Sequence, residues 1–312
     1  MDSGYAWWRV AASLALSTIG GVGLWSVVVV LPTIEAEFGV DRGGASLPYA
    51  ATMVGFAVGG ILMGRLADRF GITVPAILGT LMLGAGYVAA ASATSLWQFM
   101  LAQALLIGML GSSAIFGPLI ADISLWFVKR RGIAVAIVAS GSYLAGTIWP
   151  PILQSAIESV GWREAYAGIG AVCVATMLPL ALILRRRAPV DDGSVPISAR
   201  DIADTLRMSP AALQVLLVVA GLACCIAMSM PQVHIVAYCG DLGYGVARGA
   251  EMLSLMLGLG VVSRLVSGLI ADRIGGVATL ILGSTLQCLA LLFYLPFDGL
   301  TSLYVVSALF GL

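Results

Sequence analysis

An arginine inside an otherwise apolar stretch offers the most chemistry in this 312-residue chain. The stretch GLGVVSRLVSG, residues 258–268, surrounds Arg264 with small and apolar residues. A guanidinium in hydrocarbon costs at least about 2.5 kcal/mol, so we expect a compensating partner. On a helix, Gly260, Ser267 and Gly268 share its face. A guanidinium pairs with a carboxylate through two parallel hydrogen bonds, so Arg264 is predicted to anchor an anionic substrate. The alternative is an arginine that snorkels to the membrane surface.

Polar and aromatic residues in other apolar stretches are candidates for the same binding site. His234 is the single histidine of the chain, and Gln232 precedes it. Histidines in general titrate near neutral pH, so His234 suits substrate binding or proton transfer, with a structural histidine as an equal alternative. The aromatic candidates are Trp25, Phe116 and Tyr143, for which helix packing is the alternative.

Charged residues at the ends of apolar stretches are candidates for gating. We expect Asp122 to form an ion-pair gate with Asp68 and Arg69, and a solvated interfacial acid is the alternative. The full gating set is Asp68, Arg69, Asp122, Asp272 and Arg273.

Catalytic and metal chemistry find little support in the sequence. The single histidine and the five scattered cysteines have no metal-ligand spacing, and no nucleophile stands near a base at a workable spacing. We therefore predict no catalytic residue, no metal, no cofactor and no enzymatic activity.

The composition places these residues in a membrane. The chain is 60% hydrophobic and 10% charged, with a mean hydropathy of +1.02, whereas soluble domains are about 25% charged. We therefore expect a lipid bilayer as its surroundings. The net charge of +0 and the absence of a basic patch argue against nucleic acid as a partner.

The predicted fold is an all-α integral membrane helix bundle, because a span needs about 20 mostly apolar residues. A further apolar stretch starts near Thr301 and stops at Leu312, so we expect nine full spans, part of a tenth, and a C-terminally truncated chain. The nine stretches are 10–31, 46–66, 73–93, 97–121, 132–156, 165–184, 211–236, 249–270 and 277–296.

Basic residues predict the orientation, because they favour cytoplasmic loops. With the N-terminus inside, the outer loops carry only Arg42, Arg163 and Arg248. The cytoplasmic ends then carry Arg9, Arg65, Arg69, Lys129, Arg130, Arg131, Arg185, Arg186, Arg187, Arg200, Arg207 and Arg273.

A polar segment divides the chain. RRRAPVDDGSVPISARDIADTLRMSP is rich in proline and charge, so we predict a cytoplasmic linker at 185–210. It separates an N-terminal six-helix bundle, 1–184, from a partial C-terminal bundle, 211–312.

The two parts share a repeated motif. GRLADRFG at 64–71 recurs as GLIADRIG at 268–275, each at the end of the second span of its part. Duplicated halves joined by a linker are typical of transporters, whose substrate site lies between them.

GRLADRFG resembles the loop signature of the major facilitator superfamily, a family of twelve-span transporters built from two six-helix bundles. WFVKRRGIAVAIVASGSYLAG, 126–146, is similar to the entry into the fifth span of its monocarboxylate-transporter-like branch, and DSGYAWW, 2–8, loosely resembles the N-terminal element of that branch. Arg264 stands where this branch has a substrate-facing arginine. Gly260 stands where this branch often carries an acid, and Trp25 stands where some members carry a lysine. Both groups are implicated in proton coupling, so the resemblance leaves coupling open.

The resemblance implies a monomeric secondary active transporter that moves small organic anions such as monocarboxylates by alternating access. A bacterial-type inner membrane completes this expectation, and proton symport is the form of coupling that stays open. A facilitator-type exporter of drugs or amphipathic compounds is the first alternative. A non-transporting membrane scaffold or sensor is the alternative from another class.

Overall fold

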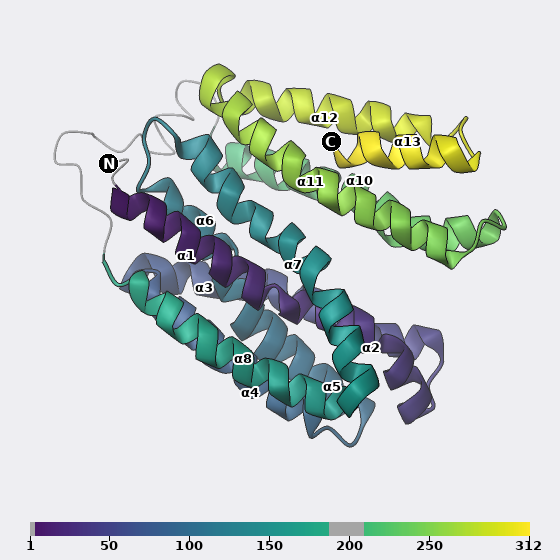
Figure 1. Ribbon diagram of the computed structural model, residues 1–312. Helices are drawn as coiled ribbons and strands as arrows, with labels where there is room; N and C mark the ends of the chain where they lie inside the picture. Colours follow the sequence, from purple (N-terminus) through teal and green to yellow (C-terminus); the bar gives the residue numbers. More distant parts are fainter. Residues whose placement is uncertain (1–3, 187–208) are drawn as a thin grey trace. The chain divides into compact units, whose positions relative to one another are not determined.

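The computed structural model describes residues 4–186 and 209–312, and all regular structure in these two ranges is helical (Figure 1). The predicted all-α architecture is therefore confirmed. The helices are α1 (Gly4–Gly20), α2 (Val22–Phe38), α3 (Arg42–Phe70), α4 (Thr73–Ala91), α5 (Leu96–Leu101), η1 (Ala102–Gly111), η2 (Ser112–Ile115), α6 (Gly117–Ser124), α7 (Arg131–Val160), α8 (Trp162–Ile183), α10 (Pro210–Asp241), α11 (Val246–Ile274), α12 (Gly276–Phe293) and α13 (Leu300–Gly311).

The predicted membrane spans correspond to these helices. Within the described residues, 9 helical segments are long and apolar enough to cross a bilayer, and Leu300–Gly311 is a shorter apolar helix. The first span joins α1 and α2, and the fourth joins α5, η1, η2 and α6. Most of the predicted linker, residues 187–208, lies outside the described residues.

The chain forms two compact units. The first unit comprises Met1–Ala188 together with Arg264–Arg273, a segment of α11. The second unit comprises Pro189–Ser263 and Ile274–Leu312. The break in the chain between the units, after Ala188, falls inside the predicted linker.

The fourth span of the first unit departs from a regular α-helix. η1 is a π-helix, with one residue more per hydrogen-bonded turn, and η2 is a 3₁₀-helix before Pro118 at the start of α6. The first span has a break at Gly21, where a Cβ atom would overlap the side chain of Ala145 on α7. Such close packing is the usual use of glycine between membrane helices.

Helix α3 lies close to the fourth span. Gly55 and Gly59 lie one helical turn apart on α3, and a Cβ atom on either would overlap the backbone of η1. The nearest atoms are the carbonyl oxygens of Ala104 and Met109. Only glycine allows the two backbones to come so close.

Each unit has its own apolar core. In the first unit, the rings of Tyr87, Phe99, Trp162 and Tyr166 pack edge to face or tilted, with centroids 5.2–6.0 Å apart. In the second unit, the buried core consists of Ile235, Cys239, Met252, Met256 and Leu303.

Candidate functional site

Arg264 lies on the part of α11 that belongs to the first unit. Its side chain is half-buried, and its guanidinium carbon lies 4.1 Å from the centroid of the Tyr143 ring on α7. This distance is within the range of a cation–π interaction. Among the residues that the structure describes, none of the ion pairs involves Arg264. The structure therefore brings two predicted binding residues together and leaves the charge of the guanidinium without a carboxylate there.

The small residues beside Arg264 serve packing at least in part. Gly268 is buried, and a Cβ atom there would lie 2.6 Å from the Cβ of Ala136 and 2.8 Å from the carbonyl oxygen of Gly132. Gly268 therefore lets this segment of α11 lie close to α7 within the first unit.

The other two aromatic candidates lie in the first unit. The indole of Trp25 donates a hydrogen bond to the carbonyl oxygen of Ser142, 3.3 Å away, next to Tyr143 in the chain. Phe116 stands at the 3₁₀-to-α transition of the fourth span, and its ring centroid lies 6.2 Å from that of Phe56. Trp25 is thus adjacent to the Tyr143 segment, whereas Phe116 packs against α3.

His234 and Gln232 belong to the second unit, on α10. The side chain of His234 is exposed and that of Gln232 is half-buried. Their predicted roles in substrate binding stay predictions.

Asp272 caps the start of a helix within the first unit. Its carboxylate accepts hydrogen bonds from the backbone amides of Gly132, at 2.6 Å, and Ile133, at 3.1 Å, in the first turn of α7. A carboxylate is stabilised there by unpaired amides and by the positive end of the helix dipole. The neighbouring Arg273 is exposed.

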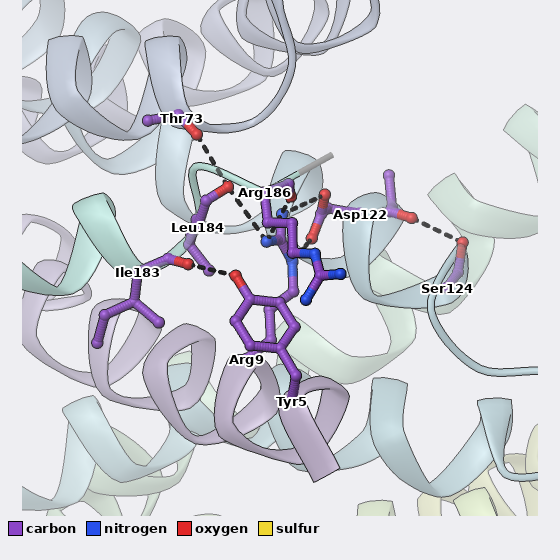
Figure 2. Close-up of polar contacts among 9 residues, drawn as sticks. Tyr5, Arg9, Thr73, Asp122, Ser124, Ile183, Leu184 and Arg186 are labelled. Carbon is purple, nitrogen blue, oxygen red and sulfur yellow. Dashed lines mark hydrogen bonds and ion pairs between the residues drawn. The ribbon is translucent and has the colours of Figure 1, made fainter. Parts of the chain in front are cut away.

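Asp122 pairs with a residue that was not among the predicted site residues (Figure 2). Its two carboxylate oxygens accept hydrogen bonds from Nε and Nη2 of Arg9 on α1, at 2.7 and 2.8 Å. The predicted gate paired Asp122 with Arg69, but Arg69 is exposed and its guanidinium carbon lies 5.2 Å from the centroid of its neighbour Phe70. Asp68 is also exposed.

Arg9 contacts more than Asp122. Its Nη1 donates to the carbonyl oxygens of Leu184, at 3.1 Å, and Arg186, at 3.0 Å, where the chain leaves α8. Its guanidinium carbon lies 4.7 Å from the centroid of the Trp126 ring. The Arg9 side chain is only 1% exposed, against 12% for Asp122. We call Arg9, Asp122 and Trp126 the Arg9 cluster.

A cavity of about 300 Å³ adjoins the Arg9 cluster in the first unit. Asp68 and Asp122 both line this cavity, so two of the three residues of the predicted ion-pair gate face the same space. Its remaining lining residues are Arg9, Ala67, Phe70, Gly71, Ile72, Thr73, Pro118, Ala121, Leu125, Leu184, Arg185 and Arg186.

A second arginine cluster is built from similar parts. Arg163 on α8 forms an ion pair with Glu37 at 2.5 Å, and its guanidinium carbon lies 4.4 Å from the centroid of the Trp162 ring. Its Nη1 donates to the carbonyl oxygens of Ala91 and Ala93, both at 2.7 Å, where α4 ends. We call Arg163, Glu37 and Trp162 the Arg163 cluster. Helix α8 runs from one cluster to the other, so the two lie at opposite ends of the first unit.

The sequence held a weak signal for the Arg9 cluster. Arg9 is the lone charge in AWWRVAASL, and Asp122 is the lone charge near the end of the fourth apolar stretch. Opposite charges at the same end of two spans are compatible with an ion pair. A basic residue near a span end also satisfies the orientation rule, and that simpler interpretation concealed the pair.

Comparisons with known proteins agree with this architecture. The chain is 30% identical over 244 residues to the MFS-type transporter pynF of Aspergillus niger, covering 76% of this chain and 54% of pynF. It is 28% identical over 287 residues to monocarboxylate transporter 11 of Homo sapiens, covering 87% of this chain and 57% of the relative. The chain thus spans little more than half the length of these two curated relatives.

The fold also matches a solved structure. The fucose:proton symporter FucP of E. coli superposes with a TM-score of 0.69 at 14% identity, over 97% of this chain and 81% of FucP. At this identity the likeness shows the fold alone. The family pattern described as Major Facilitator Superfamily matches residues 14–312. The resemblance predicted from GRLADRFG is therefore confirmed, and the chain belongs to the Major Facilitator Superfamily.

Proposed function

We propose that the chain acts in secondary active transport and moves small organic anions, monocarboxylates above all, by alternating access. Its family membership supports transport, and its likeness to a protein named as a monocarboxylate transporter supports a carboxylate substrate. The observation that carries the proposal is Arg264, a half-buried cation inside the Glu251–Ile274 span.

The surroundings of Arg264 suit an anion. Within the described residues its guanidinium has an aromatic ring beside it and no carboxylate in an ion pair. An aromatic face holds the guanidinium without neutralising its charge, so hydrogen bonds to a substrate carboxylate can still form. An arginine retained inside a span at a cost of at least about 2.5 kcal/mol is expected to serve function.

Binding of a matched pair of small molecules to the purified chain tests this proposal. We expect propionate to bind and its neutral amide, propionamide, to bind at least about tenfold more weakly, because the amide lacks the charge that Arg264 pairs with. Arg264→Lys keeps the charge but loses the planar fork, so propionate binding should weaken. Arg264→Ala should abolish it.

The control is Arg65→Ala, which removes an exposed arginine near the end of α3 and should leave propionate binding unchanged. Equal binding of acid and amide by the unaltered chain would contradict the carboxylate assignment. Binding of amphipathic compounds without any preference for anions would instead support an exporter.

We also propose that the chain lies in a cell membrane with its N-terminus in the cytoplasm. The distribution of arginine and lysine supports this orientation. Single cysteines at Glu37, Ser159 and Asp241, in a background without native cysteines, should react with an impermeant maleimide added outside intact cells. Labelling at these three positions only after the membrane is opened would reverse the orientation.

A further inference from the structure

The end of α8 leaves backbone carbonyls that the helix itself cannot satisfy. The last four carbonyl oxygens of any α-helix lack a partner within the helix. In α8 the backbone amides of Leu184 and Arg185 turn back to two of these carbonyls. Side chains from two other helices supply donors to the carbonyl of Ile183 and to carbonyls of the segment that follows it.

Three donors converge on this segment (Figure 2). The hydroxyl of Tyr5 donates to the carbonyl of Ile183 at 2.7 Å, and the hydroxyl of Thr73 donates to that of Leu184 at 2.9 Å. Arg9 reaches both Leu184 and Arg186. The junction between α8 and the chain that follows is thus tied to α1 and α4.

Asp122 fixes the orientation of Arg9 for this task. A bidentate carboxylate holds one edge of the planar guanidinium, which leaves Nη1 directed at the two carbonyl oxygens. Trp126 covers a face of the guanidinium. Every partner belongs to the first unit, so the ion pair ties this unit together internally.

We propose that Arg9 is a positioning residue that fixes the point where the chain leaves α8, and that Asp122 acts as its orienting partner rather than as a gate. A gate must open during each cycle, but opening this pair would leave a buried charge uncompensated. The transport side of the statement rests on the proposed function, whereas the positioning of the junction does not.

Limited proteolysis with trypsin tests the positioning directly. The peptide bonds after Arg185 and Arg186 lie in the segment that Arg9 holds, whereas Arg200 and Arg207 stand farther along the sequence. Trypsin also cuts after the adjacent Arg187, and cleavage there is not scored. Arg9→Lys keeps the charge but cannot make all four hydrogen bonds. Cleavage after Arg185 and Arg186 in the purified chain should become about tenfold faster, because losing one or two net hydrogen bonds eases local opening by that factor.

The sites after Arg200 and Arg207 are the internal reference, and their cleavage rates should not change. Arg163→Lys is the matched control, because it makes the same substitution in the Arg163 cluster, and it should leave cleavage after Arg185 and Arg186 unchanged. Unaltered cleavage after Arg185 and Arg186 in Arg9→Lys would overturn the proposal. Equal acceleration at all four sites would overturn it too, because Arg9 would then act on global stability.

A charge exchange separates positioning from simple pairing. In the double variant Arg9→Asp with Asp122→Arg, the two opposite charges remain, but an aspartate at position 9 cannot donate to Leu184 or Arg186. We expect the fast cleavage after Arg185 and Arg186 to persist in this variant. Restoration of the original protection would show that the ion pair alone matters and would refute the role of the carbonyl bonds.

Discussion

The Arg9 and Arg163 clusters use the same chemistry at opposite ends of the first unit. Each joins an arginine to a carboxylate, to a tryptophan ring and to two carbonyl oxygens at the end of a helix. They differ in burial. The side chains of Arg9 and Asp122 are 1% and 12% exposed, whereas those of Arg163 and Glu37 are 38% and 36% exposed.

Burial decides what each cluster contributes to stability. In water, the attraction between two charges is weak and is offset by the ordering of long side chains. When a buried ion pair loses one partner, the other charge stays buried without compensation, and this strongly destabilises the folded protein. Equal sets of contacts should therefore respond very differently to the same substitution.

The largest effect is expected for Arg9→Ala. It leaves the Asp122 carboxylate and the carbonyl oxygen of Arg186 without their donor, and breaking a buried pair costs about 3–5 kcal/mol. The carbonyl oxygen of Leu184 keeps its hydrogen bond from Thr73. The free energy of unfolding, measured by SDS titration in detergent micelles with tryptophan fluorescence as the signal, should fall by this amount. A loss no greater than that of Arg163→Ala would remove the distinction between the clusters.

A smaller loss is expected for Asp122→Asn. The amide oxygen can still accept one hydrogen bond from Arg9, and the carbonyl oxygens of Leu184 and Arg186 remain as partners. A hydrogen bond to a charged group contributes about 1.5–3 kcal/mol, and we expect a loss in this range. The same SDS titration measures it. A loss equal to that of Arg9→Ala would show that the carbonyl bonds add nothing.

Arg163→Ala should cost only about 0.2–1 kcal/mol, as is usual for exposed ion pairs. The measured quantity is again the free energy of unfolding, compared with Arg9→Ala under identical conditions. A loss above about 3 kcal/mol would mean that water does not reach the Arg163 cluster in the folded protein. That result would contradict the exposure of the Arg163 and Glu37 side chains.

The smallest expected effect is a difference between the two clusters in how the cost of the substitution depends on salt concentration. At 1 M salt the screening length falls to about 3 Å, so the cost of Arg163→Ala should shrink by a few tenths of a kcal/mol. The cost of Arg9→Ala should hardly change, because buried pairs are screened much less. Parallel unfolding curves at low and high salt check this. An equal salt response of both variants would contradict the assigned difference in burial.

Hydropathy alone was sufficient to predict the helical spans, because each crosses the same length of hydrocarbon and the polar linker interrupts the pattern. It could not reveal the π-helix at Ala102–Gly111. A run that is apolar except for Gln103 has no repeating polar face from which the number of residues per turn can be inferred. The intramembrane position of Arg264 could be predicted for the same reason as the spans. Its neighbour Tyr143 was predicted only as one aromatic residue among several.

The weak signal in the sequence was not enough to single out Arg9 as the partner of Asp122. Arg69 stands in a recognisable motif and therefore looked like the natural partner, whereas Arg9 lies 113 residues away in the chain from Asp122. Pairing at that separation is set by how α1, α6 and α8 pack. The sequence shows which residues are charged, but the packing of the helices determines which of these side chains are buried away from water.

The contact of Gly55 and Gly59 with η1 has a consequence for how the first unit can evolve and move. Backbone touches backbone there, so no neighbouring side chain can shrink to make room for a larger residue. A compensating second mutation is therefore hardly available, and these glycines should rank among the least replaceable positions of the chain. For the same reason α3 and η1 cannot rotate about their own axes independently. Any rearrangement of the unit must therefore move α3 and η1 together as one rigid body.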